Sequence, residues 1–233
     1  MVAMRLVMCL ILLPLAGFAA AAELPPMAGV GVLVRDGKAD CSAVLIAPDL
    51  VVTAAHCIAG KTLEAEGGDS QIQFRTGAYP GHQPFEQDAA TLMPHPLYLT
   101  AKIAFNQPMS SDIALIGLAA PIPASVAMPI AWGRALGDET KALVASYPGG
   151  LGSRARERIC PVTETSGSLV RLTCKVIPGE SGGSVLRLTD SGPELTAIVI
   201  AASAPGVRPY AIAVQAEDRI RQLLTIHRPE ILE

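Results

Sequence analysis

Short apolar segments, each closed by a turn residue, run through most of this chain and restrict its fold more than any other feature. Examples are VGVLVRDG, CSAVLIAPD, LVVTAAHC, QIQFRTG, IALIGL and LTAIVIA. Gly, Pro, Asp or Ser bounds most of these segments, which is typical of β-strands joined by turns. Because no ten-residue amphipathic helices alternate with them, the pattern favours antiparallel sheets or barrels over a parallel α/β sheet.

One amphipathic helix is expected near the carboxyl end of the chain. In the segment QAEDRIRQLLTI, apolar residues recur at helical spacing, and Pro229 ends the segment. These apolar residues are Ala216, Ile220, Leu223 and Leu224. Upstream, residues 119–131 (AAPIPASVAMPIA) are rich in proline and alanine, and we interpret them as a linker between two halves of the chain.

Residues 1–22 have the features of a signal peptide. Arg5 precedes the apolar run LVMCLILLPLAGF, and the small-residue segment AAAAE follows it. Pro14 and Gly17 interrupt this run, whereas a transmembrane helix needs about 20 apolar residues. We expect cleavage after Ala22, a mature domain of residues 23–233 in the periplasm or outside the cell, and no stable membrane insertion after cleavage. An uncleaved membrane anchor is the alternative.

Charge and cysteine content narrow the possible functions. The formal net charge is −3, whereas nucleic-acid binding needs a basic surface, so we expect no nucleic-acid partner. Cys9 belongs to the expected signal peptide, and an even number of cysteines remains, which fits an oxidising compartment. These four cysteines permit three pairings: Cys41, Cys57, Cys160 and Cys174. Without a C-x-x-C motif or a close histidine pair, no metal site is expected.

The segment PGESGGS at residues 178–184 places Ser181 between glycines, directly after an acid. It fits the G-x-S-x-G turn of α/β-hydrolases and is close to the G-D-S-G-G of chymotrypsin-like proteases. A glycine turn without chemistry is a third interpretation. The hydrolase interpretation needs a later histidine, and His227 at the end of the expected helix is the only one. The acids between them are Asp190, Glu194, Glu217 and Asp218.

Two upstream motifs favour the protease interpretation. VVTAAHC at residues 51–57 contains T-A-A-H-C, and SDIALI at residues 111–116 contains D-I-A-L. HPLY at residues 95–98 matches H-P-x-Y, a further segment that recurs in chymotrypsin-like proteases. With these motifs in the order histidine, acid, serine, the chain resembles the chymotrypsin/trypsin-like serine protease family, closest in pattern to secreted bacterial members. The resemblance runs from about Val30 to the terminal helix.

The resemblance implies an all-β fold of two packed antiparallel six-stranded β-barrels with a C-terminal α-helix. We expect the first barrel at about 28–118, the linker at about 119–131, the second barrel at about 132–214 and the helix at about 215–227. The resemblance also implies that the two local cysteine pairs form disulfides, Cys41–Cys57 and Cys160–Cys174. A monomer is expected.

The activity that the resemblance implies is hydrolysis of peptide bonds by a secreted serine endopeptidase through an acyl-enzyme, with a polypeptide as substrate. Ser181 would be the nucleophile, His56 its general base and Asp112 the acid that orients the imidazole. The N–H groups of Gly179 and Ser181 would form the oxyanion hole. No metal ion or other cofactor is required. The alternative is a catalytically silent homologue that binds peptides or proteins, and an esterase of the α/β-hydrolase class is less favoured.

Substrate specificity is the least determined feature. Lys175 stands six residues before Ser181, and Ile200, Ala201 and Ala202 stand where the family has S-W-G. The resemblance implies that these four residues line the specificity pocket, where Lys175 would disfavour basic substrates. The alternative places Lys175 on the exposed face of a strand.

Two departures from the serine motif of the family are Glu180 in place of Asp and Ser184 in place of Pro. A buried Glu180 carboxylate needs a basic residue or local hydrogen bonds, because an unpaired buried charge is costly. The alternative is that Glu180 is solvated. We interpret the charged segment Arg154, Arg156, Glu157 and Arg158 as a solvated loop edge. His82, His95 and His227 are interpreted as loop or surface residues.

Overall fold

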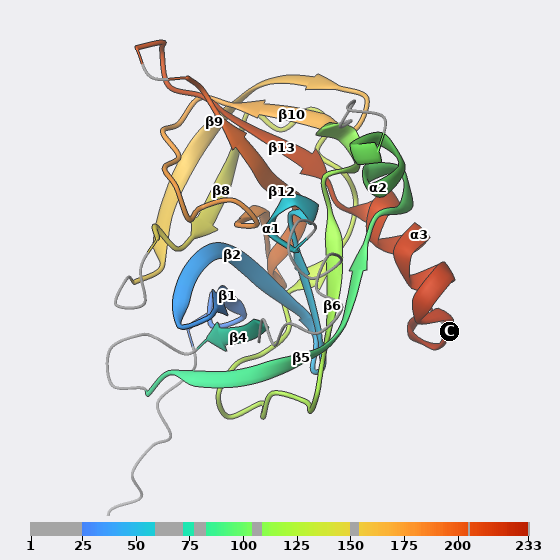
Figure 1. Ribbon diagram of the computed structural model, residues 1–233. Helices are drawn as coiled ribbons and strands as arrows, with labels where there is room; N and C mark the ends of the chain where they lie inside the picture. Colours follow the sequence, from blue (N-terminus) through green and yellow to red (C-terminus); the bar gives the residue numbers. More distant parts are fainter. Residues whose placement is uncertain are drawn as a thin grey trace, which may run out of the picture.

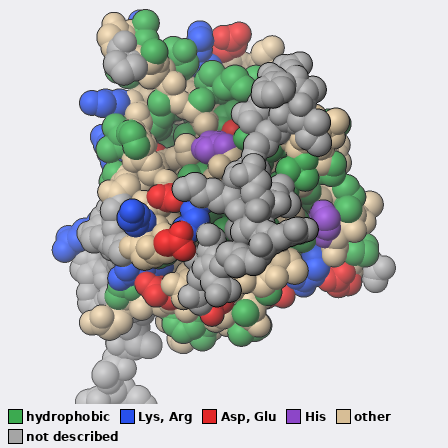
Figure 2. Space-filling view, viewed as in Figure 1, with side chains coloured by type: hydrophobic (Ala, Val, Ile, Leu, Met, Phe, Trp, Pro, Cys, Tyr) green, Lys and Arg blue, Asp and Glu red, His purple; other side chains and the backbone are tan. Residues whose placement is uncertain are grey.

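The computed structural model describes residues 25–58, 72–76, 83–103, 109–149, 154–204 and 206–232. The expected signal peptide and His82 lie outside the described residues. Figure 1 shows the strands of the amino-terminal half in the lower part of the molecule and those of the carboxyl-terminal half above them. On the face in Figure 2, basic and acidic side chains are interspersed among apolar ones.

The first six strands close into an antiparallel barrel in the order β1-β2-β3-β6-β5-β4. They are β1 (Val30–Arg35), β2 (Lys38–Ala47), β3 (Leu50–Thr53), β4 (Ile72–Thr76), β5 (Phe85–Pro94) and β6 (Ala114–Leu118). Inside, Phe74, Leu45 and Leu115 are fully buried. In β4, Ile72 and Phe74 point inward and alternate with half-buried residues, as the sequence predicts for a strand with one buried face.

Six further strands form the second barrel, in the order β11-β8-β9-β10-β13-β12, and pairing between β11 and β12 closes it. They are β8 (Lys141–Ser146), β9 (Arg156–Ser166), β10 (Leu169–Leu172), β11 (Ser184–Thr189), β12 (Gly192–Ala202) and β13 (Ala211–Gln215). A two-residue strand, β7 (Ala131–Trp132), pairs in parallel with β12 at Glu194 and Leu195. The two six-stranded barrels confirm the predicted fold class.

The helices of the described residues are short, and α1 lies near the centre of the molecule (Figure 1). α1 (Ala55–Ile58) follows β3, α2 (Pro96–Ile103) follows β5, and two 3-10 turns are η1 (Met109–Ser111) and η2 (Pro229–Ile231). The sequence pattern does not predict α2, although a proline at its first position is favourable for a helix start. Within the described parts of the chain, no helix has the length and apolar character needed to cross a membrane.

The predicted terminal helix is α3 (Glu217–His227), which leaves the second barrel and packs along the first. Its buried side is formed by Ile220, Leu223 and Leu224, as the spacing of apolar residues predicts. After the helix, Arg228 Nη2 lies 3.2 Å from the Asp49 carboxylate of the first barrel. The chain therefore returns to its first half at its end.

Candidate active site

His56 and Asp112 are brought together by strand pairing in the first barrel. Thr53 at the end of β3 pairs with Ala114 at the start of β6, so α1 and the turn before β6 are neighbours. Asp112 uses both carboxylate oxygens: Oδ1 accepts the His56 backbone N–H at 2.9 Å, and Oδ2 lies 2.7 Å from His56 Nδ1. The side chain of Asp112 is 12% exposed and that of His56 is 35% exposed.

This contact selects one tautomer of the imidazole. A carboxylate oxygen can only accept, so in the neutral imidazole the proton lies on His56 Nδ1 and the lone pair on Nε2. Tyr98 of α2 is buried close to the same carboxylate. Burial, together with the charge of Asp112, raises the pKa of the Tyr98 phenol to about 12. The phenol therefore stays protonated at neutral pH and adds no second negative charge beside Asp112.

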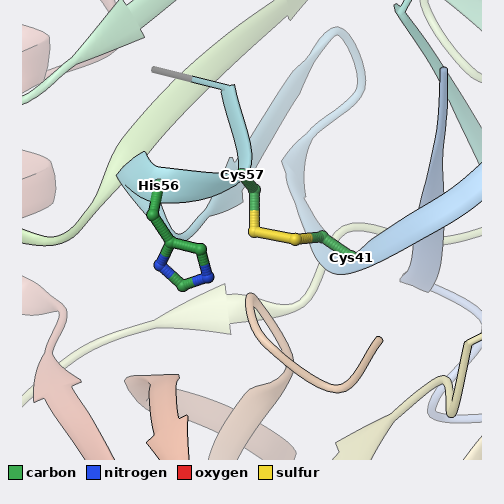
Figure 3. Close-up of side chains that lie close together, drawn as sticks. All are labelled: Cys41, His56 and Cys57. Carbon is green, nitrogen blue, oxygen red and sulfur yellow. A yellow bond between two sulfur atoms is a disulfide. The ribbon is translucent and has the colours of Figure 1, made fainter. Parts of the chain in front are cut away.

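The His56 ring also lies beside the Cys41–Cys57 disulfide, which joins β2 to α1 (Figure 3). The ligand atoms of these three residues fall within 4.8 Å of one another. The two sulfurs are bonded to each other and are therefore not the thiolates that a metal ion requires. The cluster is a structural tether next to the histidine. The second local pair, Cys160–Cys174, is also a disulfide.

The loop that carries Ser181 is fixed by hydrogen bonds at successive peptides. Gly183 N–H donates to the Glu180 carbonyl at 3.0 Å, and Gly182 N–H donates to Val199 of β12 at 2.8 Å. The Ser181 carbonyl accepts the N–H of Ser42, in β2 of the first barrel, at 2.7 Å. Ser181 itself is half-buried. The loop is therefore anchored to both barrels.

Two glycines in this loop have backbone conformations that other residues rarely adopt. Gly179 has φ +94°, and a Cβ there would lie 2.2 Å from the Gly149 nitrogen. Gly182 has φ +81°, and a Cβ there would lie 2.0 Å from the Ser42 carbonyl oxygen. Within the described parts of the chain, no backbone carbonyl accepts the N–H of Gly179 or Ser181. These N–H groups remain available to a ligand.

Glu180 is fully buried and has the basic partner that the sequence left undetermined. Arg158 Nη1 donates to Oε1 at 2.7 Å, and Ser146 Oγ donates to the same oxygen at 3.0 Å. The Ile177 N–H donates to Oε2 at 2.7 Å. The carboxylate beside Ser181 is thus held by three donors from two segments of the second barrel and from its own loop.

The interpretation of Arg158 as part of a solvated edge is wrong, whereas Arg154, Arg156 and Glu157 are exposed as expected. Alternation along β9 explains the difference. Arg158 shares the inward face of the strand with the fully buried Cys160, while Ile159 between them is 54% exposed. Counting back two residues from the cysteine would have placed Arg158 inside.

Ser184, which replaces the proline of the family motif, is buried at the start of β11. Its Oγ donates to the Ala145 carbonyl of β8 at 3.0 Å. A serine here adds a cross-strand hydrogen bond that proline cannot make, which accounts physically for this departure.

The four residues expected at the specificity pocket lie in two segments. Lys175 is exposed, Ile200 is buried, Ala201 is half-buried and Ala202 is exposed. Ile200, Ala201 and Ala202 belong to β12. Along one edge of this strand, Ala201 and Ala202 pair with β13, whereas along the other edge the pairing with β11 ends at Ile198. Among the described residues, β12 therefore has an unpaired edge from Ile200 onward, close to the loop of Ser181.

Of the other histidines, His95 lies in the connection between β5 and α2, as expected for a loop residue, but it is buried and not at the surface. Its Nε2 lies 2.9 Å from Gln222 Oε1 of α3, and its Nδ1 accepts the Leu97 N–H at 3.3 Å. Burial lowers its pKa, and the nearby Arg219 lowers it further, while the bond to Gln222 opposes these effects. His227 is exposed at the end of α3, as expected.

Two closed six-stranded antiparallel barrels, with a paired histidine and aspartate on one and a glycine-rich serine loop on the other, define the double-barrel peptidase fold. The trypsin-like peptidase domain family matches residues 41–192, more than half of the 233-residue chain. The chain belongs to this family, which confirms the resemblance inferred from its motifs. No curated protein sequence matches the chain.

Proposed function

We propose that this protein is a secreted serine endopeptidase in which Ser181, His56 and Asp112 form the catalytic triad. The observation that carries the proposal is the double contact of Asp112 with His56, at 2.9 Å to the backbone N–H and 2.7 Å to Nδ1. In the neutral imidazole, this contact places the proton on Nδ1 and the lone pair on Nε2, which is the arrangement that a general base requires. Family membership agrees with peptidase activity and with a polypeptide substrate.

In the proposed reaction, Ser181 Oγ attacks the carbonyl carbon of the scissile peptide bond while His56 Nε2 takes the hydroxyl proton. Asp112 stabilises the resulting imidazolium without taking the proton. The negative charge on the substrate oxygen would be bound by the N–H groups of Gly179 and Ser181. His56 then gives the proton to the leaving amine. In the second half of the reaction, water attacks the acyl carbon while His56 takes its proton, and Ser181 Oγ leaves and regains a proton from His56.

The unpaired edge of β12 is the proposed binding surface for the substrate backbone. An extended peptide can add to an exposed strand edge through main-chain hydrogen bonds, which recognise a polypeptide without a particular side chain. Ile200, Ala201 and Ala202 would then contact the residues on the acyl side of the scissile bond. Export to an oxidising compartment is proposed as well, because both disulfides need one to persist.

The test is labelling with a fluorophosphonate probe, followed by mapping of the modified residue in the wild type and three variants. Labelling of Ser181 is expected in the wild type, none in Ser181→Ala, and labelling slower by several orders of magnitude in His56→Ala. The matched control is His227→Ala, which removes an exposed histidine and should label at the wild-type rate.

Each alternative predicts a different result. The two antiparallel barrels already contradict the α/β-hydrolase fold; a reaction that depended on His227 would lose labelling in His227→Ala and keep it in His56→Ala. A catalytically silent homologue would show no labelling and no cleavage of a peptide library in any variant. Either outcome contradicts the proposed triad.

A further inference from the structure

Ser42 is a fully buried serine of the first barrel that contacts two segments of the second barrel. It lies in β2, and Figure 1 shows this strand at the upper side of the first barrel. Its Oγ accepts the Tyr147 N–H at 2.8 Å and donates to the Gly179 carbonyl at 2.9 Å, which is nearer than the second carbonyl acceptor, that of Tyr147 at 3.3 Å. Its backbone N–H donates to the Ser181 carbonyl at 2.7 Å. One residue thus holds both sides of the serine loop.

The hydroxyl bond acts on the part of the loop where backbone orientation matters for the proposed oxyanion hole. The Pro178 carbonyl accepts the Gly149 N–H at 3.0 Å, and the N–H of Gly179 points the opposite way because it belongs to the same planar peptide. The next peptide is held by its own carbonyl, which accepts the Ser42 hydroxyl. Gly179 is therefore fixed at both of its flanking peptides.

The same hydroxyl also joins these two restraints. Tyr147, whose N–H it accepts, is two residues before Gly149, whose N–H holds the Pro178 carbonyl. Ser42 Oγ therefore ties the turn at residues 147–149 to Gly179. A hydroxyl is suited to this position because it donates and accepts at once, which a methyl or a hydrogen atom cannot do.

From these contacts we infer that Ser42 is a positioning residue: its hydroxyl sets the orientation of the Gly179 peptide and hence the strength of the oxyanion hole. The inference rests on the proposed function and goes beyond the triad, because it assigns a role in the reaction to a residue that does not touch the substrate. The effect should appear in the transition state, where the substrate oxygen is charged, and little in ground-state binding.

The test compares Ser42→Ala with Thr196→Val in the full-length protein, using a peptide substrate and a peptide trifluoromethyl ketone. Thr196 is also fully buried, and its Oγ1 donates to the Val185 carbonyl at 2.9 Å. It controls for the loss of a buried hydroxyl away from the serine loop. Ser42→Gly removes the same hydroxyl with a different packing change and serves if the alanine variant does not fold.

We expect Ser42→Ala to lower kcat by about 10- to 100-fold, less than the 10²–10³-fold loss that follows removal of an oxyanion donor itself. KM should change by less than about twofold, and the affinity for the ketone should fall in parallel with kcat/KM. Thr196→Val should keep both values. A Ser42→Thr variant, which restores the hydroxyl, should recover most of kcat.

Several results would overturn the inference. One is a wild-type kcat in both Ser42→Ala and Ser42→Gly, and another is an equal loss of kcat in Thr196→Val, which would mean general destabilisation. A loss confined to KM, with unchanged ketone affinity, would contradict it as well. A wild-type protein that neither cleaves peptides nor labels at Ser181 would instead refute the proposed function, and the inference would fall with it.

Discussion

Replacing Glu180 by glutamine removes a charge from the centre of the serine loop with almost no change in shape. The side chain of Glu180 is fully buried, and that of Arg158 is 15% exposed. Nε and Nη2 of Arg158 are buried without a hydrogen-bond partner among the described residues, so Glu180 supplies the only compensation for this cation there. Removing one partner of a buried ion pair costs about 3–5 kcal/mol.

The hydrogen bonds of Glu180 place Glu180→Gln in the upper part of that range. Its two oxygens accept from three donors, Arg158 and Ser146 at Oε1 and Ile177 at Oε2. An amide has one oxygen, so its NH₂ group must face either the Ile177 N–H or the other two donors. We therefore expect a loss of about 4–5 kcal/mol of unfolding free energy, which is survivable where a domain has 5–15 kcal/mol.

The assay is denaturant unfolding of the wild type and three variants, together with peptide hydrolysis. Asp40→Asn is the matched control, because it neutralises an exposed pair with Arg35, and we expect a change of at most about 1 kcal/mol. The double variant Arg158→Met/Glu180→Gln also removes the buried guanidinium that Glu180→Gln leaves without a counter-charge. It should therefore be more stable than Glu180→Gln alone. Activity of Glu180→Gln should fall while the protein stays folded, because Ser181 follows directly in the chain.

The reasoning is refuted if Glu180→Gln loses no more stability than Asp40→Asn, or if it folds and keeps wild-type activity. A double variant that is less stable than Glu180→Gln would also contradict it, since the stranded charge would then not be the cause of the loss.

Three further predictions concern pH, glycine and the second disulfide. Burial lowers the pKa of His95 below its usual 6.5, so at acidic pH the unfolded chain binds a proton that the folded one does not. The unfolding free energy should therefore fall as the pH drops below about 6.5. Measured by denaturant unfolding at a series of pH values, this dependence should be weaker in His95→Gln. Gly182→Ala should lower the unfolding free energy by about 2–5 kcal/mol and abolish activity, because its Cβ would overlap a backbone carbonyl of the first barrel. The control is Gly37→Ala, where φ is +72° and nothing lies within 4 Å of the added Cβ. It should lower the unfolding free energy by about 1–2 kcal/mol in the same assay. Replacing Cys160 and Cys174 together by alanine should lower the unfolding free energy by about 3 kcal/mol, and an unchanged denaturation midpoint would contradict this.

The all-β class could be predicted from the residues because strand signals are local, whereas the arrangement in two barrels was implied by the resemblance to the family. Turn residues and alternating apolar positions recur within each segment, as in β4, and the spacing of Ile220, Leu223 and Leu224 predicted α3. The positions of His56 and Asp112 were also accessible, because each lies in a short recurrent motif at the end of a strand. The pairing of Thr53 with Ala114 then brings the two motifs together.

What the sequence did not predict depends on contacts between distant segments. Ser42 meets Tyr147 across 105 residues, and a serine beside a cysteine gives no local signal of such a contact. Arg158 and Glu180 are 22 residues apart, and a run of charged residues is usually a solvated edge. The burial of His95 was not predicted for a similar reason, because Gln222 of α3, which contacts it, is 127 residues away in the chain.

The docking of α3 has a consequence for the order in which the protein is made. Arg219 Nε donates to the Ser110 carbonyl at 2.9 Å. Gln222 contacts the ring of His95, and the backbone N–H of His95 donates to the Ile113 carbonyl. These contacts flank Asp112 on both sides, and they come from a helix that follows both barrels in the chain. A nascent chain that contains both barrels but not α3 therefore lacks this support for the proposed orienting acid. During synthesis, Asp112 gains the support only after the second barrel has been made.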